Sequence, residues 1–441
     1  MAKTVVTAAL SALFIVAAAT GCSGGNNGSE GANEPAIVKE TKPLAAENIT
    51  LKIAMNFGGY LTDDEFAKFV VDPVKKRYPN ITIQKVTMDA EANKLDKIVA
   101  SGNIPDIVIY AGPLIDQLTD LALDMNLEPL IQKHNFDLNR FEKVTLDSIK
   151  VASRKDYLIA IPYTMHFNAN YYNKDIFDKF GASYPKDGMT WEQTTDLAKR
   201  VTRQDSGVQY RGMEPDYVYR VASALALPII DDKTSKASIN TTPWRNVFET
   251  VKNIYDIPGN SKLQYAGTGQ DAFVKDKTIA MLPSLNLLAK LSQAKDLNWD
   301  MVTYPSFPEA PATGTAIDEH FMLITTNSKY KDEALKVIMT ITSDEVQKDM
   351  VQNGKNTVLK DEKIKAEFGK NLPFLTGKNI QVISRTKPAI ATASTKDMSY
   401  ARERVLKAME SFVKGEEADV NTALRKAEED INKTIEANKG K

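Results

Sequence analysis

Apolar and polar residues alternate along residues 49–55 with the two-residue period of a half-buried strand. From Thr62, a residue type that caps helices, apolar residues recur at helical spacing as far as Pro79, where a helix must stop. A second strand is predicted at 81–86 and a short buried strand at 107–110, with a helix between them. This order predicts a parallel sheet with crossover helices, and such sheets bind ligands beyond the carboxyl ends of their strands.

A second α/β region is predicted after residues 157–162. Thr190 and Thr242 stand directly before stretches with apolar residues at helical spacing, so each marks the start of a helix. The later pattern predicts strands at 278–282, 300–304 and 321–325, helices at 332–341 and 344–351, and a helical tail.

The beginning of the chain has a different pattern. Lys3 precedes an apolar run at 5–19, which is too short for a comfortable bilayer span and is followed by small residues. Residues 1–21 are therefore predicted to be a signal peptide. Residues 22–48 lack apolar periodicity and are rich in Gly, Asn, Ser and Glu, so they are predicted to be a flexible tether.

Cys22 is the single cysteine, and the run Ala19-Thr20-Gly21-Cys22 resembles a bacterial lipobox. The resemblance implies a lipid attached to Cys22, which would hold the protein on the extracellular face of the cell membrane. Two or three acyl chains are enough for stable anchoring. A plain secretory peptide with an incidental cysteine is the alternative.

Composition narrows the function classes. The 441 residues are enough for two domains of ordinary size. Lys and Arg number 56 against 57 Asp and Glu, so no broad positive field is available to hold nucleic acid. One cysteine, three scattered histidines and the lack of an EF-hand loop give no basis for a metal site, and no cofactor is predicted.

Five groups of residues occur in an order that points to a known family. Residues 100–108 contain a Gly-Asn-Ile-Pro-Asp strand entry, and residues 161–163 begin an Ile-Pro strand. A Tyr-Asn-Lys-Asp turn at 172–175 and a Thr-Trp-Glu helix start at 190–192 follow, and residues 273–281 end in Ala-Met. From about residue 49 to its end, the chain resembles the extracellular solute-binding proteins of ABC importers, family 1, in the branch that includes the maltose-binding protein.

The resemblance implies an α/β protein with a two-lobed periplasmic-binding-protein-like (type II) fold. Each lobe is expected to be a mostly parallel sheet flanked by helices, with a hinge between the lobes. Residues 49–162 and 315–368 are expected to form the N-terminal lobe, and 163–314 and 369–441 the C-terminal lobe. Hinge closure around a ligand excludes water and strengthens each hydrogen bond inside.

The implied function is that of a substrate-binding lipoprotein. It would capture an extracellular carbohydrate between the lobes and deliver it to the permease subunits of an ABC importer. The protein is expected to be a monomer without enzymatic activity, to contact the membrane through its lipid anchor only and to bind no nucleic acid.

A sugar site needs aromatic faces for C–H surfaces and planar polar groups for hydroxyls. At the strand ends of the first region the candidates are Tyr60, Asp64, Asp89, Tyr110 and Gly112. Tyr60 could instead be a loop aromatic that packs on its own helix. Asp89 could instead lie at a solvated helix start.

The remaining candidates lie at the expected crossings and on a late helix. They are Tyr163 and His166 at the first crossing, Ser284 and Asn286 after the Ala-Met strand, Glu319 and His320 near the second crossing, and Tyr400. A purely structural hinge histidine is the alternative for His166. Arg402 or Arg404 could reach an acidic ligand, whereas Trp191 is predicted to be core.

The main alternative function is a secreted glycoside hydrolase. Such an enzyme needs two carboxylates about 5 to 9.5 Å apart across a cleft, and nothing in the spacing of the acidic residues specifies such a pair. From residue 49 onward, where the α/β regions are predicted, the sequence has no Gly-x-Ser-x-Gly elbow, no His-Glu-x-x-His helix and no Walker phosphate loop.

Overall fold

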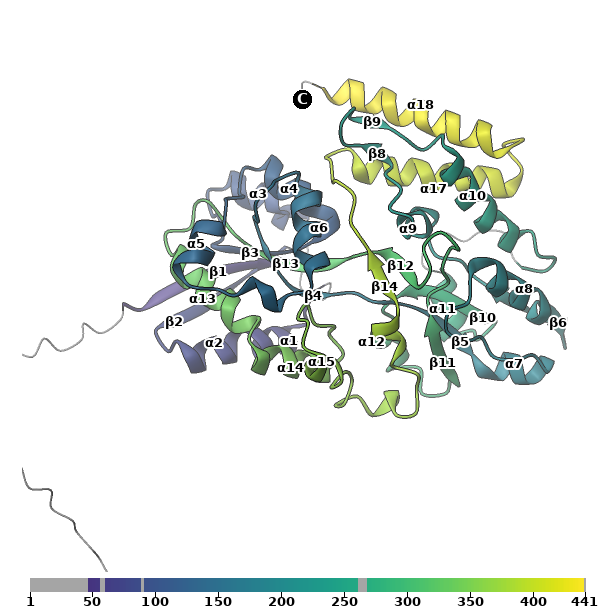
Figure 1. The fold of residues 1–441 in the computed structure, drawn as a ribbon, viewed down its shortest axis with the longest axis horizontal. Helices are drawn as coiled ribbons and strands as arrows, with labels where there is room; N and C mark the ends of the chain where they lie inside the picture. Colours follow the sequence, from purple (N-terminus) through teal and green to yellow (C-terminus); the bar gives the residue numbers. More distant parts are fainter. Residues whose placement is uncertain (1–46, 56–59, 89–90, 261–267, 440–441) are drawn as a thin grey trace, which may run out of the picture. The chain divides into compact units, whose positions relative to one another are not determined.

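A computed structural model describes residues 47–55, 60–88, 91–260 and 268–439. The first of two large sheets has the strand order β2-β1-β3-β13-β4 (Figure 1). β1 runs parallel to β2 and β3, while β13 runs antiparallel to β3 and β4. Its strands are β1 (Ile49–Met55), β2 (Ile81–Thr87), β3 (Ile107–Ala111), β4 (Ile161–Met165) and β13 (Glu319–Ile324).

The second large sheet has the order β11-β5-β10-β7-β6. Only β10 and β7 are parallel, and the other neighbours are antiparallel. Its strands are β5 (Asn168–Asn173), β6 (Arg203–Asp205), β7 (Val208–Met213), β10 (Ile279–Leu285) and β11 (Trp299–Thr303). Both sheets are thus mixed and not mostly parallel as expected, because parallel pairing is confined to β2-β1-β3 and β7-β10. We call each large sheet with its helices a lobe.

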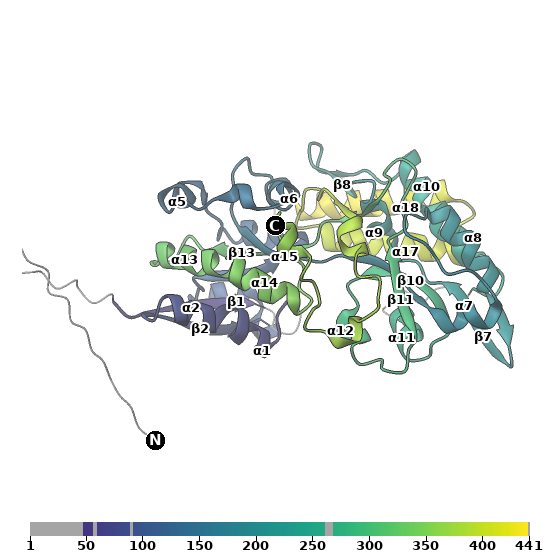
Figure 2. The same cartoon turned by 60° about the horizontal axis from the view of Figure 1, so that its bottom comes forward.

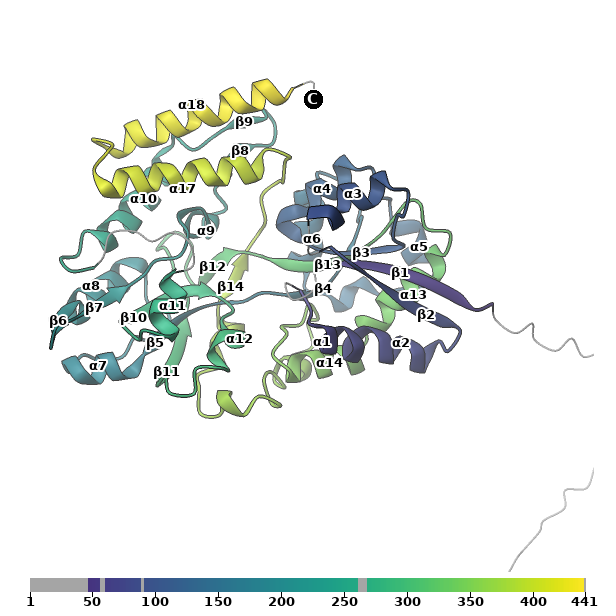
Figure 3. The same ribbon diagram turned by 180° about the vertical axis from the view of Figure 1, so that it is seen from behind.

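Helices cover both faces of the first sheet (Figures 1 and 3). They are α1 (Asp63–Phe66), α2 (Asp72–Arg77), α3 (Leu95–Ala100), α4 (Ile115–Asp120), α5 (Glu128–Lys133), α6 (Lys143–Ser153), α13 (Lys331–Ile341), α14 (Asp344–Gln352) and α15 (Glu362–Lys365). The predicted helix from Thr62 forms with its capping box, and a π-helical turn at Ala67–Val71 joins α1 to α2. Pro73 follows that turn and has no N–H for an ordinary helical hydrogen bond, which explains the wider turn.

The helices of the second lobe include α7 (Lys174–Phe180), α8 (Trp191–Val201), α9 (Val218–Ser223), α10 (Thr242–Tyr255), α11 (Thr268–Val274), α12 (Leu288–Leu291), α16 (Val382–Arg385), α17 (Met398–Lys414) and α18 (Val420–Asn438). Thr190 and Gln193 form the predicted capping box of α8. Trp191 is 2% exposed and packs edge-to-face on Tyr304, so its assignment to the core is confirmed. α9 lies beside α17 (Figures 1 and 2).

Three segments cross between the lobes. The first leads from β4 to β5, and the second passes through β12 (Thr313–Ala316) to β13. The third contains β14 (Lys387–Ala389), which pairs in parallel with β12. A backbone hydrogen bond of 2.9 Å from His166 N–H to the Asp318 carbonyl joins the first crossing to the second. The minor pair β8 (Ile230–Asp231) and β9 (Lys236–Ala237) completes the strands described here.

Candidate functional site

A cavity of about 300 Å³ lies beyond the carboxyl end of β3. The first lobe contributes Ala111–Leu114 and Ala152, and α9 and α17 of the second lobe contribute Tyr219, Arg220 and Arg402. The second crossing contributes Thr315–Asp318. We call this the interlobe cavity. It lies at the kind of sheet edge at which the sequence predicted a ligand, because parallel strands end together there.

Three of the side chains that line the interlobe cavity carry charge: Arg220, Asp318 and Arg402. Arg220 Nη1 lies 3.4 Å from Oδ1 of the buried Asp216. Asp216 also accepts hydrogen bonds from the Tyr217 N–H at 2.8 Å and from the Tyr304 hydroxyl at 3.3 Å. Burial raises the pKa of Asp216, and the Arg220 charge opposes that shift. Arg220 therefore has its own counter-ion behind the cavity wall.

Asp318 and Arg402 are less fully engaged. Within the described part of the chain, neither side chain has a hydrogen bond or an ion pair. The Arg402 guanidinium lies 5.6 Å from the ring centre of Tyr219, and that ring stacks on Tyr217 at 5.6 Å with only 4° between the planes. Burial lowers the pKa of Arg402, while Tyr219 and the negative charge of Asp318 oppose the shift.

An aromatic cluster lies at the same edge of the first sheet. The ring of His320 contacts Tyr60 at 4.6 Å and His166 at 4.8 Å between ring centres. Tyr60 also lies 6.3 Å from Tyr110, and Tyr163 lies 6.3 Å from His320. Burial raises the pKa of Tyr60 and lowers the pKa of both His166 and His320. The structure thus brings together five of the residues that the sequence singled out.

Glu319 and Gly112 form a tight contact behind the interlobe cavity. Glu319 is fully buried, and its two carboxylate oxygens have no partner among the described residues. Burial therefore raises the pKa of Glu319 well above its usual range. A Cβ atom on residue 112 would lie only 2.7 Å from Glu319 Oε1, so the backbone can approach this carboxyl group only because residue 112 is glycine.

The other predicted site residues lie elsewhere. Asp64 is exposed in the first turn of α1, and Ser284 lines a small cavity of about 50 Å³ next to Asp216 and Arg220. Asn286 Oδ1 accepts a hydrogen bond from the Leu288 N–H. The Tyr400 hydroxyl donates a hydrogen bond to Asp430 of α18 at 3.1 Å, so the partner of this side chain lies within the second lobe. Asp89 and Cys22 lie outside the described residues.

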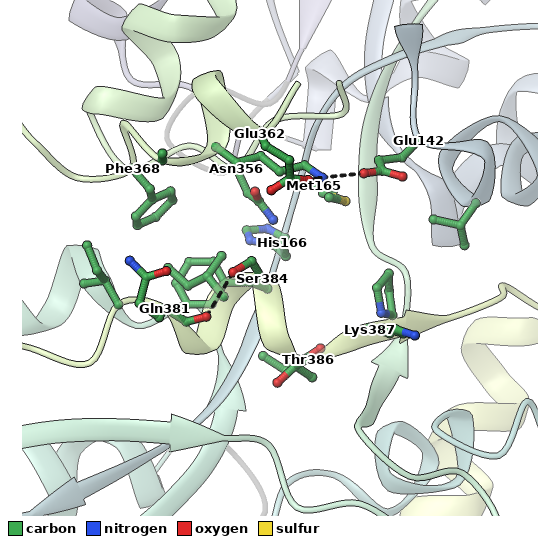
Figure 4. A pocket seen from close by; sticks show the side chains of 18 residues that line it. Glu142, Met165, His166, Asn356, Glu362, Phe368, Gln381, Ser384, Thr386 and Lys387 are labelled. Carbon is green, nitrogen blue, oxygen red and sulfur yellow. Dashed lines mark hydrogen bonds and ion pairs between the residues drawn. The ribbon is translucent and has the colours of Figure 1, made fainter. Parts of the chain in front are cut away.

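A larger cavity of about 620 Å³ adjoins the first and third crossings (Figure 4). We call it the hinge cavity. Three of its charged side chains pair with one another, as Lys365 Nζ lies 2.6 Å from Glu142 and 2.8 Å from Glu362, while Lys387 also lines the cavity. Phe167 and Phe368 contact edge-to-face at 5.7 Å. We consider the interlobe cavity the better candidate despite its smaller volume, because it lies at the carboxyl end of β3 and holds two charged groups without direct partners.

Sequence reasoning did not select Tyr217, Tyr219, Arg220 or Asp318. The signal was present, because Glu214-Pro215-Asp216-Tyr217 directly follows β7 and precedes a helix, as polar and aromatic residues do at a sheet edge. No group of three or more His, Cys, Asp or Glu side chains that could hold a metal occurs in the described ranges. Among those same residues, no helix has both the length and the apolar character needed to cross a bilayer.

Comparison with solved structures identifies the fold. The fold is similar to that of a sugar transporter protein from Rhizobium etli in an open conformation, with a TM-score of 0.71, 19% identity, and coverage of 87% of this chain and 99% of that chain. It is also similar to the sugar-binding protein MalE from Xanthomonas citri, with a TM-score of 0.71, 16% identity, and coverage of 89% and 98%. The predicted two-lobed α/β fold is confirmed.

The family follows from the sequence itself. The family model described as "Bacterial extracellular solute-binding protein" matches residues 70–362, about two thirds of the chain. The diacetylchitobiose binding protein NgcE of Streptomyces coelicolor is 23% identical over 283 residues, which are 59% of this chain and 58% of that relative. The chain belongs to the family of bacterial extracellular solute-binding proteins. The prediction of a binding protein in place of a glycoside hydrolase is thereby confirmed.

Proposed function

We propose that this protein captures a carbohydrate in the interlobe cavity and delivers it to the permease of an ABC importer. The observation that carries the proposal is the cavity wall itself, where Tyr219, Arg220 and Arg402 of one lobe face Ala111–Leu114 of the other across Asp318. Aromatic faces beside carboxylate and guanidinium groups suit the C–H surfaces and hydroxyls of a sugar. Two similar proteins, NgcE and MalE, carry names that state saccharide binding.

The proposal includes closure of the two lobes over the ligand. Three extended crossings connect the lobes, and hinge motions of domains are absorbed by a few residues in such connections. Closure would bring the walls of the interlobe cavity onto the ligand and exclude water from its hydrogen bonds. The lobe boundaries predicted from the sequence belong to this proposal.

The location on the cell is also proposed. The lipobox-like run ending at Cys22 supports a lipid anchor, and the Gly- and Asn-rich residues 22–48 suit a tether of roughly 25 to 30 Å. A monomer on the extracellular face of the membrane, with the permease as its partner, is consistent with the family description.

The test is isothermal titration calorimetry with residues 47–441 against mono- and oligosaccharides, polyols and peptides. We expect saturable binding of at least one saccharide and a rise in Tm with its concentration, because a ligand that binds only the native state stabilises it by mass action. Unchanged saccharide after prolonged incubation is expected as well. If only peptides or other solutes bind, the carbohydrate proposal is wrong although the family assignment stands.

A further inference from the structure

The charges around the interlobe cavity define which saccharides it accepts. The lining includes two guanidinium groups and one carboxylate, which alone would favour an acidic ligand. However, Arg220 is already paired with the buried Asp216 behind the wall. One carboxylate, Asp318, and one guanidinium, Arg402, are then left to face the ligand, and their charges cancel.

We infer that the interlobe cavity selects a neutral saccharide, with Asp318 accepting hydrogen bonds from its hydroxyl groups and Arg402 donating to its hydroxyl or ring oxygens. This inference rests on the proposed function and narrows its substrate class. A sugar hydroxyl is both a donor and an acceptor, so a single neutral ring can satisfy a carboxylate and a guanidinium at once.

Contacts hold the backbone of Asp318 and the side chain of Arg402 before a ligand arrives. The Asp318 carbonyl accepts the His166 N–H at 2.9 Å, and the neighbouring Ile317 N–H donates to Ala389 at 2.8 Å, so the backbone of Asp318 is tied to both other crossings. Arg402 lies over Tyr219, whose ring is supported by Tyr217. Preorganised groups lose little conformational entropy on binding.

A charged ligand would disturb this balance. A uronic acid would add a second carboxylate to the site that holds Asp318, and an amino sugar would add a second cation to the site that holds Arg402, so closure would enclose a net charge away from water. A charge enclosed in a protein without a partner is strongly unfavourable. We therefore expect uronic acids and amino sugars to bind about tenfold or more weakly than the matching neutral sugars.

The test uses matched saccharides and two variants that each remove one charge. Calorimetry compares neutral mono- and oligosaccharides with their uronic acids and amino sugars, including diacetylchitobiose against its deacetylated form. Asp318→Asn and Arg402→Gln are each expected to weaken binding of the neutral saccharide about tenfold to a hundredfold, because each removes a charged hydrogen-bond partner. Asp318→Asn should also shift relative preference toward uronic acids, and Arg402→Gln toward amino sugars, which a merely structural role would not produce.

Arg404→Gln is the matched control. Arg404 lies two residues further along α17, with its guanidinium 3.2 Å from Asp430 and over the Tyr400 ring, within the second lobe. Its loss should leave saccharide affinity unchanged, and unfolding curves show whether each variant is folded. Uronic acids that bind as well as neutral sugars, or folded Asp318 and Arg402 variants with unchanged affinity and preference, would overturn the inference. Failure of every saccharide to bind the unmodified protein would overturn the proposed function, and the inference with it.

Discussion

Glu319 is a carboxyl group in a place where its charge is disfavoured. It is fully buried, without a hydrogen-bond partner in the described structure, and burial raises its pKa well above the usual value. The folded state favours the protonated form of Glu319. The contribution of this preference to the stability of the protein is therefore fully present below the pKa of an unfolded glutamate, about 4.3. It is lost as the pH rises toward the folded-state pKa.

Replacing Glu319 with Gln tests this directly. The neutral amide has nearly the same shape and cannot ionise. At pH 8 we therefore expect Glu319→Gln to raise the free energy of unfolding by about 1–3 kcal/mol, because it removes the cost of burying a carboxyl group that is ionised in the unfolded state. The gain should shrink toward pH 4, where the carboxyl group becomes protonated in the unfolded state as well. Urea unfolding at several pH values measures both. Titration of the buried His166 and His320 cancels in the difference, and a gain that is independent of pH would contradict the prediction.

Gly112 gives a second prediction at this contact. A Cβ at residue 112 would meet Glu319 Oε1 at 2.7 Å, and the buried carboxyl group has little room to move away. Gly112→Ala should therefore lower the free energy of unfolding by about 1–3 kcal/mol, as overpacking does. In the background of Glu319→Ala the same change should be much milder. Equal effects in both backgrounds, measured by urea unfolding, would show that the contact is not the cause.

Elements governed by local sequence were predictable. The strand at 49–55, the helix starts at Thr62 and Thr190 and the strands near 280 and 300 all form, because alternation, helical spacing and capping boxes act over a few residues. The direction of the strands was harder to predict from the sequence. β13 lies antiparallel between β3 and β4, although more than 150 residues separate it from both, and no local pattern encodes that pairing.

The candidate site could likewise be predicted only in part from the sequence. Of the residues that the sequence singled out, Gly112 lines the interlobe cavity, and it directly follows β3. Asp318 and Arg402 act as a pair only because the second crossing and α17 meet at one cavity, which requires the tertiary fold. The sequence suggested Arg402 for an acidic ligand, since it gave no sign that Asp318 would balance the charge.

The α8 cap provides a prediction at the scale of one element. The Thr190 hydroxyl accepts the Gln193 N–H at 3.2 Å, and the Gln193 side chain accepts the Thr190 N–H at 3.0 Å. Thr190→Ala should lower the free energy of unfolding by about 1 kcal/mol, because the Gln193 N–H loses its acceptor at the helix start. Saccharide affinity should stay the same, since α8 contributes nothing to the interlobe cavity as described. Denaturation and calorimetry together check both statements.

At the scale of the whole molecule, the proposed closure can be measured as a distance. Cys22 is the single cysteine, so Cys22→Ser leaves a background in which introduced cysteines are labelled selectively. Lys97 on α3 and Lys433 on α18 are exposed and belong to different lobes. Spin labels at these two positions should move closer together when a saccharide binds, because closure rotates one lobe toward the other about the crossings.

Labels at Lys97 and Lys133 provide the matched control, since both positions are exposed and belong to the first lobe. Their distance should not change on binding, because a rigid lobe moves as a unit. A shift in both pairs would indicate a change within the first lobe, not a hinge motion. If calorimetry shows binding while neither distance changes, the ligand enters a cavity that is already formed, and affinity must then come from preorganisation of Asp318 and Arg402 alone.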